Sequence, residues 1–121
     1  MIIPVPMFKS DIRKRGYNQS KLIAKEVSER INVPVCDKAV IKNRKTLPQK
    51  SLSRAERLNN LNGAFVITDR KHILRKNILL LDDVCTTGST LAEITKLLLE
   101  NGAATVFCCA CCKTPTLKEN V

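Results

Sequence analysis

Two adjacent carboxylates, Asp82 and Asp83, directly follow an apolar run in the sequence. A stretch rich in hydroxyl groups comes next and comprises Thr86, Thr87, Gly88, Ser89 and Thr90. Backbone N–H groups and hydroxyls at a helix start suit a phosphate group, and glycine lets the backbone approach it closely. Ionised carboxylates accept hydrogen bonds from sugar hydroxyls and can hold Mg²⁺. The stretch therefore predicts a binding site for a ribose 5-phosphate.

Two other interpretations of this stretch are open. Thr90 and Glu93 have the T-x-x-E spacing of a helix capping box, which by itself would explain hydroxyls near a helix start. Capping does not explain two acids after an apolar strand, because a buried and unpaired carboxylate is costly. A P-loop nucleotide site would require a Gly-Lys pair, and the sequence has none.

Strands and helices alternate around this stretch. Short apolar runs predict strands at residues 2–6, 39–41, 64–67, 77–83 and 105–112. Apolar positions at helical spacing predict a helix over residues 17–31 and another from Leu91 to a stop at Asn101-Gly102. The run at 77–83 is apolar on both faces, as in a parallel strand that helices cover from both sides. The sequence therefore predicts an α/β fold with a mostly parallel sheet flanked by helices.

Two polar segments interrupt this pattern. Residues 9–16 are strongly basic, and we expect them to form a loop. Residues 42–63 are also polar and basic, and a loop of this length is unusual in a small domain unless it is functional. We therefore expect a flexible lid at about 42–63, with a helical turn between Arg54 and Leu61.

Composition and charge narrow the class of protein. A chain of 121 residues with 44% hydrophobic and 26% charged residues suits one globular domain, residues 1–121. No apolar run approaches a membrane span and the N-terminus does not resemble a secretory signal, so we expect a cytoplasmic protein without membrane insertion. The net charge of +10 falls mostly within residues 1–60 and favours a polyanionic partner, either nucleic acid or a phosphate-rich small molecule. Aromatic residues are only 3%, which leaves little material for stacking on bases and favours the small molecule.

Four of the six cysteines lie in one short run, Cys108, Cys109, Cys111 and Cys112. Their C-x-x-C spacing could supply half of a zinc site. Residues three apart in a strand face opposite sides, however, and no turn is indicated here. We therefore interpret the run as a strand that uses cysteine as a small apolar residue, and we expect no structural zinc.

The stretch at 78–90 resembles the phosphoribosyl pyrophosphate (PRPP) motif of type I phosphoribosyltransferases. Further motifs resemble the ComF family within that group: "PVP" at 4–6, "RGYNQSKLIA" at 15–24, R-x-T-x-P-Q at 44–49, L-S-x-x-x-R-x-x-N at 52–60, "GAF" at 63–65 and "NGA" at 101–103. The resemblance covers nearly the whole chain. ComF proteins usually carry a cysteine-rich zinc ribbon and a further segment before "PVP", so we expect this chain to be a short form or a fragment.

The resemblance implies roles for individual residues. Asp82 and Asp83 would bind the ribose hydroxyls and Mg²⁺ and act in catalysis together with Arg57, while Arg15 and Arg44 would bind PRPP with the 5′-phosphate loop at Thr86–Thr90. The segment after "PVP" matches the pyrophosphate loop. Residues 42–63 match the lid that closes over PRPP.

The implied activity is transfer of a phosphoribosyl group to an unidentified acceptor, with release of pyrophosphate through an oxocarbenium-like state. A second hypothesis is a non-catalytic module that senses PRPP or assists the DNA-uptake machinery associated with the ComF family. A third is direct DNA binding by the basic half, which should weaken steeply with salt. The oligomeric state is open, with a dimer as one option.

Overall fold

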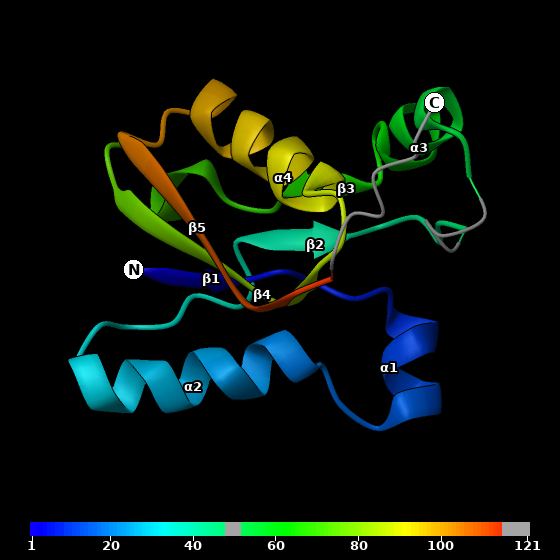
Figure 1. Ribbon diagram of the computed structural model, residues 1–121. Helices are drawn as coiled ribbons and strands as arrows, with labels where there is room; N and C mark the ends of the chain where they lie inside the picture. Colours follow the sequence, from blue (N-terminus) through cyan, green and yellow to red (C-terminus); the bar gives the residue numbers. More distant parts are fainter. Residues whose placement is uncertain (48–51, 115–121) are drawn as a thin grey trace.

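The computed structural model describes residues 1–47 and 52–114, except for the side chain of Leu58. Helices and strands alternate along this part of the chain (Figure 1). In chain order they are β1 (Ile2–Pro4), α1 (Lys9–Arg15), α2 (Gln19–Ile31), β2 (Val40–Lys42), α3 (Arg54–Leu61), β3 (Phe65–Ile67), the short 3-10 helix η2 (Arg70–His72), β4 (Asn77–Cys85), α4 (Ser89–Glu100) and β5 (Thr105–Lys113).

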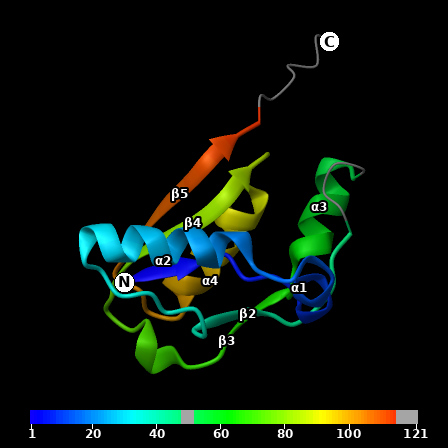
Figure 2. The same cartoon turned by 90° about the horizontal axis from the view of Figure 1, so that it is seen from below.

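The main sheet has the strand order β1-β4-β5, and both strand pairs are parallel (Figure 2). Leu79 of β4 lies beside Ile2 on one side and beside Phe107 on the other. The strands β2 and β3 form a separate antiparallel pair. The structure thus confirms the predicted α/β class and the mostly parallel sheet.

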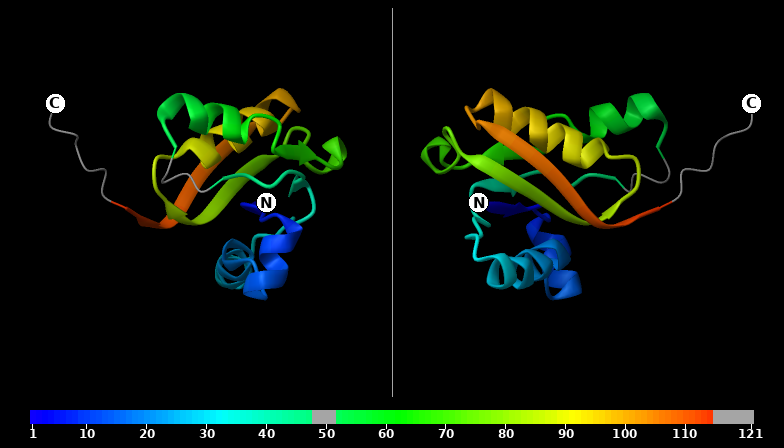
Figure 3. Two further views of the ribbon diagram at one scale, coloured as in Figure 1. Left: turned by 90° about the vertical axis from the view of Figure 1, so that its right-hand side faces the viewer. Right: turned by 60° about the vertical axis from the view of Figure 1, so that its left-hand side comes forward.

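The central strand β4 is buried on both faces because its side chains alternate between two apolar clusters. Ile78 and Leu80 pack with Leu91, Ile94 and Leu98 of α4. Leu79 and Leu81 pack instead around Ala24 of α2, together with Ile23 and Val27. The two helices therefore cover opposite faces of the sheet (Figure 3), as the apolar run predicted.

Local capping interactions fix where the two covering helices begin and end. Asn18 precedes α2, and its side-chain oxygen accepts a hydrogen bond from the N–H of Ser20 at 3.0 Å. Asn32 follows α2 in the left-handed conformation. Gly88 precedes α4 with a φ of +82°, and Gly102 follows it with a φ of +95°. The predicted stop at Asn101-Gly102 is therefore confirmed.

The prediction of a basic loop at residues 9–16 is wrong, because residues 9–15 form helix α1. Asp11 lies in its first turn and Arg13, Lys14 and Arg15 lie in its last, so the charges match the helix dipole. Gly16 ends the helix with its N–H donating to the carbonyl of Ile12. The apolar periodicity failed to indicate this helix because none of its residues is buried.

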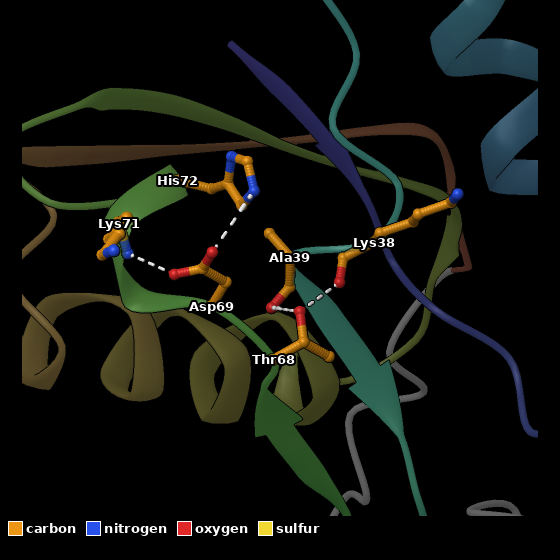
Figure 4. Close-up of polar contacts among 6 residues, drawn as sticks. All are labelled: Lys38, Ala39, Thr68, Asp69, Lys71 and His72. Atoms are coloured by element: carbon orange, nitrogen blue, oxygen red, sulfur yellow. Dashed lines mark hydrogen bonds and ion pairs between the residues drawn. The ribbon is translucent and has the colours of Figure 1, made fainter.

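Hydrogen bonds at the end of β3 hold the small antiparallel pair in place (Figure 4). The hydroxyl of Thr68 donates to the carbonyl oxygens of Lys38 and Ala39, which precede β2. Asp69 caps η2 by accepting from the N–H of Lys71 at 2.9 Å, and it also lies 3.6 Å from His72. In the described part of the chain, no helix is long and apolar enough to cross a membrane.

Candidate functional site

The two predicted carboxylates lie near the carboxyl end of β4, at the edge of the sheet where α2 and α4 begin. The strand does not end at these acids but continues to Cys85. Asp82 is only 9% exposed, and its Oδ1 accepts from the hydroxyl of Ser20 at 3.1 Å and from the N–H of Asp83 at 2.9 Å. Asp83 is partly exposed beside it. The fold thus holds one carboxylate inside the protein and one at the surface.

Burial raises the pKa of Asp82 from the ordinary 3.8 to about 6. A hydrogen bond with the Asp83 carboxyl contributes to this rise in pKa, while the N–H of Asp83 and the hydroxyl of Ser20 act against it. Within residues 1–47 and 52–114, no cationic side chain forms an ion pair with Asp82 or Asp83. A buried carboxylate without a cation is the kind of perturbed group that is common at functional sites.

The predicted phosphate loop turns from β4 into α4 beside Asp82. A small cavity of about 30 Å³ is bordered by the Asp82 carboxylate, the residues that follow it, and the first turn of α4, namely Val84, Cys85, Thr86, Thr87, Gly88, Ser89, Thr90 and Leu91. The Thr87 and Ser89 hydroxyls lie 2.7 Å apart. The structure therefore brings the whole predicted loop together with one of the two acids.

The capping-box interpretation of this loop is wrong. Gly88 occupies the capping position of α4 and provides no side-chain cap, and Thr90 lies inside the first helical turn rather than before it. Thr87 Oγ1 accepts only a long hydrogen bond of 3.4 Å from the N–H of Ser89. A glycine is favoured at position 88 because its φ of +82° is unfavourable for residues with a side chain.

Of the three predicted arginines, only Arg57 lines a described cavity next to the loop. It borders a shallow cavity of about 630 Å³ together with Arg54, Lys96, Thr87, Gly88, Ser89, Ala92 and Glu93. Arg15 is exposed at the last position of α1 and does not line this cavity. The roles of these arginines in PRPP binding stay predictions.

Arg44 has a structural contact of its own. Its Nη2 donates to the carbonyl oxygens of Asn60 and Asn62, each at 2.7 Å. The amide of Asn60 also exchanges two hydrogen bonds with the backbone of Leu47, at 2.9 and 3.0 Å. The two described arms of the predicted lid, 42–47 and 54–62, are therefore tied to each other. Whether this segment closes over a ligand stays a prediction, and residues 48–51 at its centre lie outside the described residues.

Ser20 is a site residue that the sequence analysis did not single out. It is only 3% exposed, and it links the first turn of α2 to Asp82 across 62 residues of sequence. The matching motif "RGYNQSKLIA" contained it, but no spacing indicated that its hydroxyl would reach the acid. Arg54 and Lys96 were also missed, because surface cations carry no distinguishing pattern in a basic chain.

A third cavity, of about 430 Å³, lies beside the segment that follows β1. Its walls are mainly apolar, and Lys9, Lys21 and Lys42 contribute its cations. Lys42 is half-buried, which lowers its pKa, and its Nζ donates to the Thr46 hydroxyl at 2.7 Å. Pro6 to Lys9, the predicted pyrophosphate loop, also line this cavity.

The donor set at the carboxyl end of β4 fits Mg²⁺ better than a soft metal. Carboxylate oxygens are hard ligands, and Mg²⁺ is commonly held by one or two carboxylates together with substrate oxygens and water. The described residues contain no group of three or more His, Cys, Asp or Glu side chains that could hold a metal by themselves. Cys108, Cys109, Cys111 and Cys112 lie on the extended strand β5, as predicted.

Comparisons with known proteins identify the family of this domain. The phosphoribosyl transferase domain model matches residues 17–121. The DNA utilization protein YhgH of Shigella flexneri is 40% identical over 113 residues, covering 93% of this chain and 49% of its own length. Competence protein F of Haemophilus influenzae is 39% identical over 102 residues, covering 84% of this chain and 44% of its own. Competence protein ComFC of Bacillus subtilis is 32% identical over 104 residues, which cover 86% of this chain and 40% of the length of ComFC.

The parallel sheet and the acid-plus-hydroxyl loop define a phosphoribosyltransferase-like domain. The chain belongs to the phosphoribosyl transferase domain family and, within it, to the ComF group. It spans about half the length of the curated relatives it matches.

Proposed function

We propose that this chain binds PRPP at the carboxyl end of β4 and transfers its phosphoribosyl group to an acceptor, releasing pyrophosphate. The observation that carries the proposal is the cavity shared by Asp82 and the loop at 86–90. It places an acid suited to sugar hydroxyls beside backbone and hydroxyl groups suited to a phosphate.

In the proposed reaction, the loop at 86–90 binds the 5′-phosphate, and Asp82 and Asp83 bind the ribose hydroxyls. The same two carboxylates would hold Mg²⁺, which supplies positive charge to the leaving pyrophosphate. Arg57, near the loop, adds further positive charge. Ser20 orients the Asp82 carboxylate through its hydrogen bond. No protein nucleophile is needed, because the C1′ carbon can react through an oxocarbenium-like state.

Calorimetric titration of PRPP, with and without Mg²⁺, tests binding directly. The Asp82→Asn/Asp83→Asn variant should lose at least tenfold in affinity, because it keeps the side-chain shape but removes both negative charges. Asp69→Asn is the control, since it changes one partly exposed acid that caps η2 away from the site. Equal PRPP affinity in the wild type and the double variant would remove the carboxylates from the site.

The relatives are named for DNA utilization and competence, which favours a role in DNA uptake as a second candidate function. In this second proposal the chain senses PRPP without catalysing transfer. Release of pyrophosphate from PRPP separates the two functions. Release that depends on an added nucleobase supports the transferase. Binding of PRPP without release, over a panel of nucleobases, supports the sensor.

A further inference from the structure

The shallow cavity between α3 and α4 is positively charged and lies against the predicted phosphate loop. Arg54 and Arg57 of α3 line it together with Lys96 of α4. Among the described lining residues, Glu93 is the one acid. Figure 1 shows α3 beside the start of α4. A cavity bordered by three cations and one acid favours an anionic ligand.

The phosphate loop is a wall common to this cavity and to the smaller one at Asp82. Thr87, Gly88 and Ser89 border both cavities, whereas Asp82 borders only the smaller. The smaller cavity, of about 30 Å³, has room for a single small group, while the larger has about 630 Å³. A ligand that begins at the acid and crosses the loop would therefore continue between α3 and α4.

The loop keeps hydrogen-bond donors available for such a ligand. In the part of the chain that the structure describes, the N–H groups of Thr86, Thr87 and Gly88 donate to no protein acceptor. The hydroxyls of Thr87 and Ser89 belong to the same turn and lie 2.7 Å apart. Unpaired N–H groups before a helix bind phosphate oxygens, as the proposed function requires for the 5′-phosphate.

Two cations of the larger cavity are available as well. Arg54 and Lys96 are exposed, and neither side chain forms an ion pair or hydrogen bond with another residue of the ranges 1–47 and 52–114. Guanidinium and ammonium groups bind phosphates through charge-assisted hydrogen bonds. The larger cavity can therefore take phosphate groups in addition to the one in the loop.

PRPP carries its phosphates at opposite ends of the ribose. Its pyrophosphate is attached at C1′, and its single phosphate is attached at the 5′ carbon. When the 5′-phosphate occupies the loop, the pyrophosphate therefore points away from the loop. Only a ligand with further phosphates on its 5′ side would extend from the loop into the larger cavity.

We propose that a ribonucleoside 5′-triphosphate binds at this site and competes with PRPP. Its ribose hydroxyls contact Asp82 and Asp83, and its first phosphate occupies the loop at 86–90. Its outer two phosphates reach Arg54 and Lys96. Because both ligands use the same acids and the same loop, this binding mode rests on the proposed function, and the two ligands exclude each other. The triphosphate would thus regulate the domain by keeping PRPP out.

Calorimetric titration with ATP and AMP tests the contribution of the outer phosphates. At fixed Mg²⁺ and ionic strength, the wild type should bind ATP about tenfold more tightly than AMP. Arg54→Gln/Lys96→Gln should bring the two affinities within about threefold of each other by weakening ATP alone. Arg13→Gln/Lys25→Gln removes the same two kinds of exposed cation from α1 and α2, so it should keep the wild-type preference. A wild type without a preference for ATP, or equal loss of the preference in both variants, would overturn the proposal.

A deoxyribose analogue separates this proposal from the function on which it rests. The 2′-deoxy form of ATP lacks one hydroxyl of the diol, so the wild type should bind it more weakly than ATP. Equal affinity for the two, with the preference for ATP over AMP retained, would remove the acids and with them the proposed function. A retained deoxy effect without a preference for ATP over AMP would instead remove only the larger cavity.

PRPP titrations identify the occupant of the larger cavity. Saturating ATP should lower the apparent PRPP affinity of the wild type, and an unchanged affinity would show that the triphosphate binds elsewhere. Without ATP, the Arg54→Gln/Lys96→Gln variant should bind PRPP as the wild type does. A loss of PRPP affinity as large as the loss for ATP would assign the cavity to the pyrophosphate of PRPP and contradict the proposal. If this variant loses affinity for a single-stranded DNA oligonucleotide but not for ATP, the cavity binds nucleic acid and the proposal is wrong.

Discussion

Replacing Asp82 by asparagine should stabilise the folded protein while removing its proposed ligand affinity. The carboxylate is 9% exposed, and burial raises its pKa from 3.8 to about 6. That difference corresponds to roughly 3 kcal/mol of destabilisation once the group is ionised in both the folded and the unfolded states. Asparagine keeps an oxygen that can accept the hydrogen bonds from Ser20 and from the N–H of Asp83, so most of this cost should be relieved.

The pH dependence of this stability difference follows from the upward direction of the Asp82 pKa shift. Well below pH 3.8 the carboxyl is neutral in both states, so the two proteins should be equally stable. Between about pH 4 and pH 6 the wild type ionises only when unfolded, so its stability falls relative to the variant as pH rises. Above about pH 6 the difference should level off. PRPP and Mg²⁺ affinity of the wild type should rise through the same upper range, because the ionised form is the one that binds.

Thermal unfolding across this pH range measures the effect. In a domain of this size each kcal/mol shifts Tm by roughly 3–6 °C, so a gain of several degrees is expected at pH 8 and none well below pH 3.8. Asp37→Asn provides a contrast of opposite sign, because a hydrogen-bonded ion pair with Lys21 at 2.6 Å lowers the pKa of Asp37. That variant should lose stability at neutral pH and regain parity as the pH falls below the pKa of Asp37. If Asp82→Asn is less stable than the wild type at pH 8, the reasoning from burial is wrong.

Two further predictions concern the scaffold. Gly102→Ala should destabilise the protein more than Gly16→Ala, measured by denaturant unfolding. Both glycines have φ near +90°, but a Cβ at 102 would lie 2.6 Å from Leu74 Cδ1, whereas a Cβ at 16 would meet nothing within 4 Å. Arg44→Ala should speed amide hydrogen exchange in residues 54–62, because it removes the two hydrogen bonds from Arg44 to the backbone of that segment. Exchange in β4 should stay slow. Unchanged exchange in residues 54–62 would show that the Arg44 contacts do not hold the segment.

The fold could be predicted largely because its signals are local. The apolar run of β4 and the helical spacing after it depend on the residues that pack, so the positions of Ile78 and Leu91 in the sequence were enough to indicate both elements. Helix α1 left no such signal, because it buries none of its residues. Its boundaries depend instead on Gly16 and on the match of charges to the helix dipole, which apolar periodicity does not reveal.

The sequence was enough to predict the acids and the loop of the candidate site, but not the hydrogen bonds that join these residues to distant parts of the chain. Asp82 and the residues at 86–90 are close in sequence, so their spacing was enough to bring them together. Ser20 reaches Asp82 only because α2 packs on the face of β1 and β4, which no local pattern specifies. Arg44 shows the opposite case, since its motif indicated a ligand contact and the structure shows it bonded to the protein's own backbone.

The placement of Asp82 connects the stability of the fold to its proposed function. Two helices, α2 and α4, begin near this edge of the sheet, and their first turns present Ser20 and Ser89 toward it. Helix N-termini favour negative charge, so they partly offset the burial of the acid but do not neutralise it. The ionised acid therefore remains costly until a cation or a sugar hydroxyl reaches it. A ligand that supplies both should stabilise the wild type against heat far more than it stabilises Asp82→Asn, because only the wild type has this cost to relieve.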